Sequence, residues 1–359
     1  MLVKISKTDV TTLLLDCKWS GSRTTVARTL DFTIVQDDRD SNIPVVNADT
    51  GMTVYGYKEP DPDELLAQVK TDTSKDDEKQ KEAAPIFVGN IYKIEKNRAQ
   101  GTLHIIAHDH AFVLAHSKTT RQFNNVAPED IAGQICKELG VTAGNLAKTY
   151  TPVSFIANRK TGYQIIMGAY NEAAKIIKQN AGKDENGKDK EDPKYQLIMN
   201  GPKLDVIKKG ELIKDYILDS VSNMTNSTYS ESIENIINQV MIVDKNGNEK
   251  DFVKDDDDIK KHSAFQDVYK EDPNKDTQTE AKAMLKKPER EGTIAAIGDY
   301  RAVASYSIAI KDSLQNSQSA QFWIKSDTHI FKDGNHEMRL VLEYENMMND
   351  EKVEKDKEK

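Results

Sequence analysis

Apolar and polar residues alternate along several stretches of this chain, and the first of these stretches covers residues 13–35. Two alternating runs lie there on either side of a polar, glycine-containing link. Alternation with a period of two is typical of strands that have one buried and one solvated face. Two such runs joined by a short link predict an antiparallel hairpin. Because a hairpin alone is only marginally stable, we expect further strands to complete it.

Strand patterns recur in both halves of the chain. They appear at 86–94 and 103–107, and again after residue 194. The clearest predicted hairpin is the last, in which Met338, Leu340, Leu342 and Tyr344 alternate strictly with Glu337, Arg339, Val341 and Glu343. The turn signal Asp333–Gly334 lies near the middle of that hairpin. The pattern therefore predicts a mainly β protein, and the five or six strands of the first 110 residues predict a small barrel or sandwich.

Helical periodicity replaces the β pattern in residues 111–193. Pro128 suits the first turn of a helix, and apolar residues then recur every four positions up to Leu139. Thr161 and Gln164 have the spacing of a capping box, which predicts the start of a second helix. Behind them, an apolar stripe runs to Ile177. These helices predict a small helical unit between two β regions.

The predicted fold class is thus α+β and mainly β. A polar segment at 60–84, in which only three apolar residues could pack, is predicted to be a solvated excursion between strands. The predicted layout has a first β unit at 1–110, a helical insertion at 111–193, a second β unit at 194–248 and 292–346, a charged helical insertion at 249–291, and a disordered tail at 347–359.

Composition narrows the function classes. A formal net charge of −9 argues against a basic surface for nucleic-acid recognition. The two cysteines are too few for a disulfide framework, which favours a reducing compartment. The first ten residues lack the apolar core of a signal peptide, and no apolar run has the roughly 20 residues of a membrane span. We expect synthesis and folding in a cytoplasm.

The sequence offers one candidate metal site, formed by His104, His108, His110 and His116. Zinc sites use such clusters, but no cysteine or carboxylate pair completes this ligand set. The acidic run 255–258 lacks the spacing of a calcium loop. No phosphate loop or nucleophile elbow is present, and Cys17 lies on the apolar side of its strand. We predict no catalytic site, no metal and no cofactor.

Three segments, in order along the chain, resemble phage tail hub proteins of the XkdQ type from PBSX-like prophages. The central helix TGYQIIMGAYNEAAKII is one of them. The other two are the opening WSGSRTTVARTLDFTIV and the closing DTHIFKDGNHEMRLVLEY. The matching positions are Trp19, Ser20, Gly21, Arg23, Ala27, Arg28, Leu30 and Phe32 in the opening, and Asp327, His329, Phe331, Gly334 and His336 in the closing hairpin.

Such proteins are similar to the hub of T-even phages, to late control D proteins and to the N-terminal part of type VI secretion spike proteins. The resemblance implies a homotrimer in which each chain contributes two tube-like antiparallel β-barrels. Three chains would then match a hexameric tail tube above and a trimeric central spike below. The expected partners are the tube, the spike and other baseplate proteins, and the expected location is the baseplate of a virion or tail-like bacteriocin.

The same resemblance leads us to expect subunit contacts from the hairpins at 13–35 and 322–344. The candidate interface residues are Trp19, Arg28, Phe32, Trp323, Phe331 and Leu340. Two other functions compete with the structural hub. One is a tail-associated cell-wall hydrolase, which the lack of a hydrolase motif disfavours. The other is a periplasmic or surface β-sandwich that binds a ligand, which the missing signal peptide disfavours.

Overall fold

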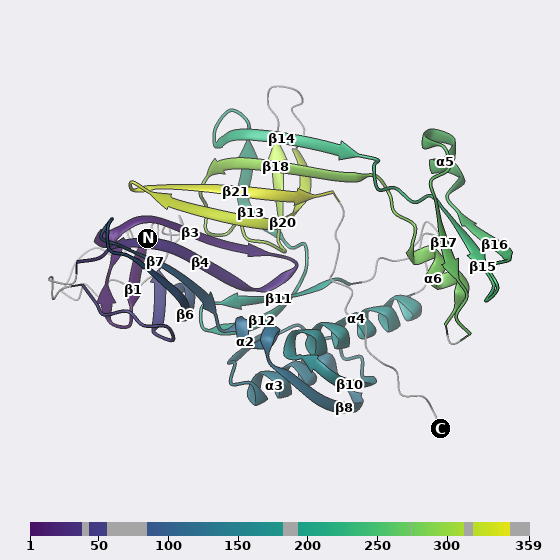
Figure 1. Cartoon of the computed structure of the whole chain (residues 1–359), viewed down its shortest axis with the longest axis horizontal. Helices are drawn as coiled ribbons and strands as arrows, with labels where there is room; N and C mark the ends of the chain where they lie inside the picture. Colours follow the sequence, from purple (N-terminus) through teal and green to yellow (C-terminus); the bar gives the residue numbers. More distant parts are fainter. Residues whose placement is uncertain (38–42, 56–84, 182–192, 274, 312–318, 345–359) are drawn as a thin grey trace, which may run out of the picture. The chain divides into compact units, whose positions relative to one another are not determined.

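The computed structural model describes residues 1–37, 43–55, 85–181, 193–273, 275–311 and 319–344 (Figure 1). The chain forms two compact units, one of residues 1–226 and 294–359 and the other of residues 227–293. The solvated excursion predicted at 60–84 and the disordered tail predicted at 347–359 lie outside the described residues.

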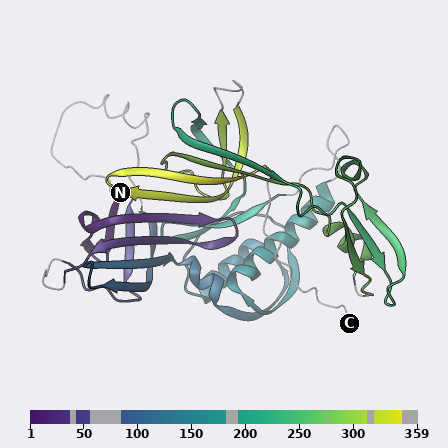
Figure 2. The same ribbon diagram turned by 45° about the horizontal axis from the view of Figure 1, so that its top comes forward.

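A curled sheet of thirteen strands dominates the larger unit, so the mainly β prediction is confirmed (Figures 1 and 2). Hydrogen-bonded neighbours follow the order β14-β18-β21-β20-β3-β4-β7-β6-β5-β1-β2, and β13 joins the sheet through β19, which pairs with β20. The strands are β1 (Leu2–Ile5), β2 (Thr8–Asp9), β3 (Leu14–Ser22), β4 (Thr25–Val35), β5 (Gly51–Tyr55), β6 (Pro85–Asn97), β7 (Thr102–Asp109), β13 (Leu212–Asp219), β14 (Met224–Ser232), β18 (Glu289–Ile297), β19 (Ser307–Lys311), β20 (Ser319–Lys332) and β21 (Asn335–Glu343).

Both predicted hairpins form, and they pair with each other. Strands β3 and β4 are antiparallel, and so are β20 and β21. Positive φ angles at Asp333 (51°) and Gly334 (78°) build the tight turn between β20 and β21. Strand β20 also lies antiparallel to β3, with His329 opposite Trp19. The β20–β3 pairing therefore joins the first part of the chain to its last part.

Two separate hydrophobic clusters fill the two parts of this sheet. The first contains Phe32 and Ile105 and is built mainly from strands β1 and β3 to β7, with Phe331 of β20 added. The second contains Ile308 and Leu340 and is built mainly from strands β13, β18, β19, β20 and β21. The alternation of the sequence explains both clusters, because every second residue of these strands faces inward.

Helices and two small sheets form the middle of the larger unit. The helices are α2 (Ala111–His116), α3 (Pro128–Glu138) and α4 (Gly162–Ala181). Strand β8 (Lys118–Val126) pairs with β10 (Val153–Thr161), and the second small sheet has the order β11 (Tyr195–Asn200), β12 (Lys203–Lys208), β9 (Ala143–Leu146). Among the helices of the described ranges, none combines the length and apolar character needed to cross a membrane.

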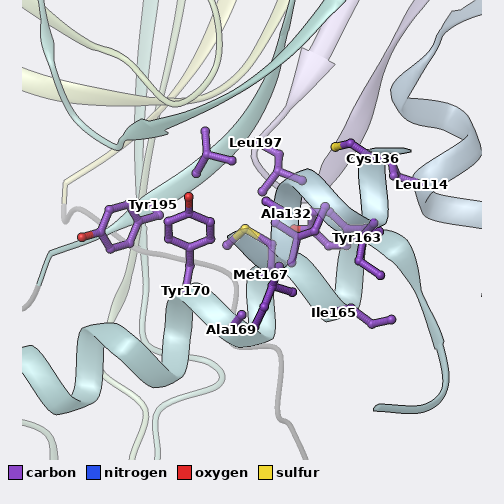
Figure 3. Packing of buried hydrophobic residues seen from close by; sticks show 14 of the residues in the cluster. Leu114, Ala132, Cys136, Tyr163, Ile165, Met167, Ala169, Tyr170, Tyr195 and Leu197 are labelled. Carbon is purple, nitrogen blue, oxygen red and sulfur yellow. The ribbon is translucent and has the colours of Figure 1, made fainter. Parts of the chain in front are cut away.

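The predicted helix signals are confirmed. Pro128 opens α3, and the capping box forms in both directions before α4. The Thr161 N–H donates to Gln164 Oε1 at 3.1 Å, and the Gln164 N–H donates to Thr161 Oγ1 at 3.2 Å. Tyr170 of α4 packs against Tyr195 of β11, with ring centroids 4.9 Å apart (Figure 3). Residues 195–206, which the pattern assigned to the second β unit, thus share the core of the helices.

Residues 227–293 form the second unit around a three-stranded sheet. Its strands are β15 (Gln239–Val243), β16 (Glu249–Lys254) and β17 (Gln266–Lys270), with β15 in the middle. Helices α5 (Asp256–His262) and α6 (Thr277–Ala283) complete it. The unit begins earlier than the insertion predicted at 249–291, because β15 pairs with β16 and β17 rather than with the large sheet.

Candidate functional site

Arg28 of β4 lies where the two hairpins pair, and its guanidinium binds Asp327 of β20 in a bidentate manner. Nη1 donates to Asp327 Oδ1 at 3.1 Å, and Nη2 donates to Oδ2. The guanidinium also lies over the ring of Trp19, 3.9 Å from its centroid. Such paired, charge-assisted hydrogen bonds fix both distance and orientation. We call the buried cluster of Trp19, Arg28, Asp109, Asp327, His329 and His336 the junction.

Asp327 is the acceptor at the centre of the junction. Its side chain is fully buried, and that of Arg28 is 11% exposed. The Ala304 N–H donates to Asp327 Oδ1 at 2.7 Å, so the carboxylate also holds the loop before β19. A buried carboxylate needs several such donors to offset the loss of its hydration. Asp327 therefore connects β4, β20 and this loop.

Two histidines extend the junction along β20 and β21. His329 Nε2 lies 3.2 Å from the Ala302 carbonyl oxygen, which can only accept, so Nε2 carries the proton. His329 Nδ1 then accepts from His336 Nε2 at 3.0 Å. Burial lowers the pKa of both His329 and His336 to about 4. Both imidazoles are therefore neutral near pH 7, and Phe331 stacks on His336 with ring centroids 4.3 Å apart.

A second carboxylate, Asp109 at the end of β7, binds the backbone of the same arginine. Asp109 Oδ2 accepts from the Arg28 backbone N–H at 2.9 Å, and Oδ1 accepts from the Ala111 N–H at 3.0 Å. Burial raises the pKa of Asp109 to about 7, although these contacts with Arg28 and Ala111 oppose the shift. Asp109 thus ties the start of α2 to β4.

A second ion-pair network holds the tip of the first hairpin. Arg23 Nε donates to Glu343 Oε1 at 2.6 Å, and Lys209 Nζ lies 3.2 Å from Glu343 Oε2. Gln196 Nε2 donates to the Arg23 carbonyl oxygen at 3.2 Å. Burial lowers the pKa of Lys209 to about 8, although Glu343 opposes the shift. Residues of the helical core and both hairpins therefore meet at this tip.

The six candidate interface residues fall into two groups. Trp19, Arg28 and Phe331 lie in or against the junction. Phe32 and Leu340 are completely buried in the two hydrophobic clusters, and Trp323 is half-buried on β20 opposite Glu343. Their burial gives these side chains packing roles within one chain. Subunit contacts from the two hairpins stay a prediction.

The four histidines of the candidate metal site have separate partners. His104 Nε2 lies 2.7 Å from Asp31, and its Nδ1 lies 3.4 Å from Glu95. His108 and His116 both stack on Phe112, and His110 is the N-cap of α2. Within the ranges that the structure describes, no group of His, Cys, Asp or Glu side chains has the arrangement of a metal site.

The charged groups of the junction pair with one another inside the protein, because Arg28 binds Asp327 and Asp327 also accepts from the Ala304 N–H. The thiols are equally enclosed, because Cys17 and Cys136 are both buried and unbridged. Burial raises the pKa of Cys17 to about 12 and that of Cys136 to about 11, which suppresses the nucleophilic thiolate at neutral pH.

Residues 17–343 match the YQBQ-like family, and this range includes every residue of the junction. The chain belongs to the YQBQ-like family. It is 23% identical over 277 residues to YqbQ of Bacillus subtilis (strain 168), a match that covers 74% of this chain and 79% of the relative. This family match agrees with the coarser part of the sequence resemblance, which is to a family of prophage-region proteins.

Solved structures share the fold over nearly the whole chain. The 43 kDa tail protein of prophage MuSo2 from Shewanella oneidensis superposes with a TM-score of 0.66 at 11% identity, covering 95% of this chain and 97% of that one. A tail protein from Neisseria meningitidis MC58 gives a TM-score of 0.60 at 11% identity, covering 95% of each chain. A chain of the lidded Francisella PdpA–VgrG complex gives 0.51 at 8% identity, covering 94% of this chain and 50% of that one.

Proposed function

We propose that this protein is a structural component of a phage-type tail, and specifically its baseplate hub. The observation that carries this proposal is the fold shared with the MuSo2 tail protein over 95% of the chain. A chain of the PdpA–VgrG complex supports the same proposal. Half of that chain has the fold of this protein, and that chain is part of a multi-protein assembly. A purely structural role, without catalysis, fits the enclosed chemistry of the junction.

We further propose a homotrimer of the XkdQ type in which each chain supplies two tube-like barrels. The two hydrophobic clusters along one sheet support this division, because each could be the core of one barrel. Three chains would then present six similar bodies around one channel, matching a hexameric tube on one side and a trimeric spike on the other. The location would be the baseplate, with other baseplate proteins around it.

In this proposal the junction has a specific task. A ring of six bodies closes only if the two bodies within each chain keep a fixed angle. The bidentate pair of Arg28 and Asp327 spans the β20–β3 boundary between the two clusters, and its geometry restricts rotation there. The ion pairs of Arg23 and Lys209 with Glu343 restrict the same boundary at the hairpin tip.

Native mass spectrometry tests the hub proposal. The purified chain would be measured alone, with its tail tube protein, and with its spike protein from the same gene cluster. We expect complexes with three copies of this chain, together with six tube subunits or one trimeric spike. Six copies in one closed ring, or failure to bind both partners, would contradict the proposed symmetry.

A further inference from the structure

A cleft of about 700 Å³ opens beside the junction within the larger unit. Its walls come from β11 with the turn after it, from the beginning of β13, and from the loop before β19. Trp19 and Arg28 also line it, together with the first residues of β6. A volume of this size lies within the range of ordinary ligand pockets.

Two of its walls are strand edges. Six consecutive residues, 196–201, line the cleft from β11 and its turn, and five consecutive residues, 211–215, line it from β13. Side chains of a regular strand alternate between two faces, so the run of lining residues in β11 indicates that this strand presents its edge. In β13 the pairing with β19 is interrupted between Leu212 and Ile217, and this irregular stretch faces the cleft. Within the described residues, β11 pairs only with β12, and β13 pairs only with β19. An extended segment could therefore add to either edge.

Three residues that line the cleft carry buried polar atoms without hydrogen-bond partners. Among the described residues, Trp19 Nε1, Arg28 Nε and Gln196 Oε1 are buried and have no hydrogen-bond partner. Trp19 is 4% exposed and Gln196 is 1% exposed, so unpaired polar atoms in them are costly. Two are donors and one is an acceptor, which is the complement of the carbonyl and the N–H of a peptide group.

We propose that this cleft binds an extended peptide segment of another protein chain. The two strand edges match the extended form of a peptide, and the unpaired donors and acceptor lie in residues of the cleft wall, where they could pair with its backbone. The cleft carries both charge signs, with Lys214 and Arg301 near Glu211 and Asp215. This balance favours a neutral segment with alternating apolar side chains over a strongly acidic or basic one. The inference does not depend on the proposed tail role.

Tryptophan fluorescence provides the test, because the chain has only two tryptophans. A Trp323→Phe variant of the full chain leaves Trp19, in the cleft wall, as the sole fluorophore. The probe is the hexapeptide acetyl-Val-Thr-Val-Thr-Val-Thr-amide, titrated to millimolar concentration. We expect a saturable change in Trp19 emission. The same peptide with alternate amides N-methylated should bind at least about tenfold more weakly, because it loses backbone donors.

A second variant tests the protein side of the contact. Gln196→Leu in the Trp323→Phe background removes the unpaired acceptor and should weaken peptide binding about fivefold to tenfold. Gln100→Leu, in the exposed turn between β6 and β7, should leave binding unchanged. The midpoint of thermal unfolding of each variant shows whether it is folded.

Three results would overturn the proposal. The first is no saturable change in emission with the hexapeptide. The second is equal binding of the hexapeptide and its N-methylated form. The third is a crystal structure, grown with the peptide, in which ordered water alone contacts Trp19 Nε1, Arg28 Nε and Gln196 Oε1.

Discussion

Replacing Asp327 with asparagine should strongly destabilise the larger unit. Asparagine keeps the shape of the side chain and can still accept the Ala304 N–H bond. It removes the negative charge that faces Arg28, whose side chain is only 11% exposed. The guanidinium would then be a buried charge without its counter-ion. Asp109 cannot replace the lost charge, because it binds the Arg28 backbone N–H and its pKa is raised to about 7 by burial.

The free-energy cost of Asp327→Asn can be estimated from the burial of the Arg28–Asp327 ion pair. Removing one partner of a buried ion pair costs about 3–5 kcal/mol, because the other charge is left uncompensated. Since a small part of the Arg28 side chain contacts solvent, we expect the lower end of this range, about 3 kcal/mol. Native proteins are stable by roughly 5–15 kcal/mol, so Asp327→Asn should remove a large part of the total.

Urea denaturation followed by tryptophan fluorescence measures this loss selectively. Trp19 and Trp323 both lie in the larger unit, so their emission does not report on residues 227–293. The matched control is Lys93→Gln on β6, which breaks an exposed pair and should leave the midpoint unchanged. In a double-mutant cycle, Asp327→Asn with Arg28→Met should cost much less than the sum of the single changes. Additive costs, or a single-variant cost below about 1 kcal/mol, would refute the reasoning.

Three further predictions concern the junction and its surroundings. Gly21→Ala places a Cβ in steric overlap with the guanidinium of Arg28 and should cost about 1–3 kcal/mol in urea unfolding, whereas Gly51→Ala, with open space around it, should be neutral. Burial raises the pKa of Asp109 to about 7 in the folded protein, so its contribution to stability is present below about pH 4 and is lost as pH rises through 7. The free energy of unfolding of Asp109→Asn, compared with that of the parent protein, should therefore increase as the pH rises from 4 to 8. A difference between the two proteins that is independent of pH would contradict this. Cys17 and Cys136 should resist a thiol reagent at pH 7.5 until urea unfolds the chain, and fast labelling of the native protein would disprove their enclosure.

The strands and helices with strong periodicity were predictable from the sequence. Strict alternation identified β3, β4, β20 and β21, and the capping box identified the start of α4. Strands β8, β9, β10, β14, β16 and β17 were missed, and β8 and β17 show why. Most residues of β8 are exposed, so no apolar alternation marks it. Strand β17 lies in a charge-rich segment with one weakly covered face, and its composition resembles that of a loop.

The junction itself could not be assembled from the sequence, because Arg28 and Asp327 are separated by 299 positions. One signal was present. Residues 109–112 and 327–331 each begin with an aspartate and end with a phenylalanine, and in the structure Asp109 ends β7 whereas Asp327 lies inside β20. In the structure both carboxylates bind Arg28. Asp109 accepts from its backbone N–H, and Asp327 accepts from its guanidinium. The family resemblance also included Gly21, whose lack of a side chain leaves room for that arginine.

The segment 233–288, between β14 and β18, has a consequence for engineering. It leaves the large sheet at the end of β14 and returns at the start of β18, two strands that are hydrogen-bonded neighbours. Contacts of Ile297 with Asn223 and of Arg290 with Glu231 show that the two strands run in opposite directions. A short asparagine–glycine turn could therefore bridge them in place of the whole insert. Other protein domains could be inserted at this position, and the strand order of the large sheet would stay the same.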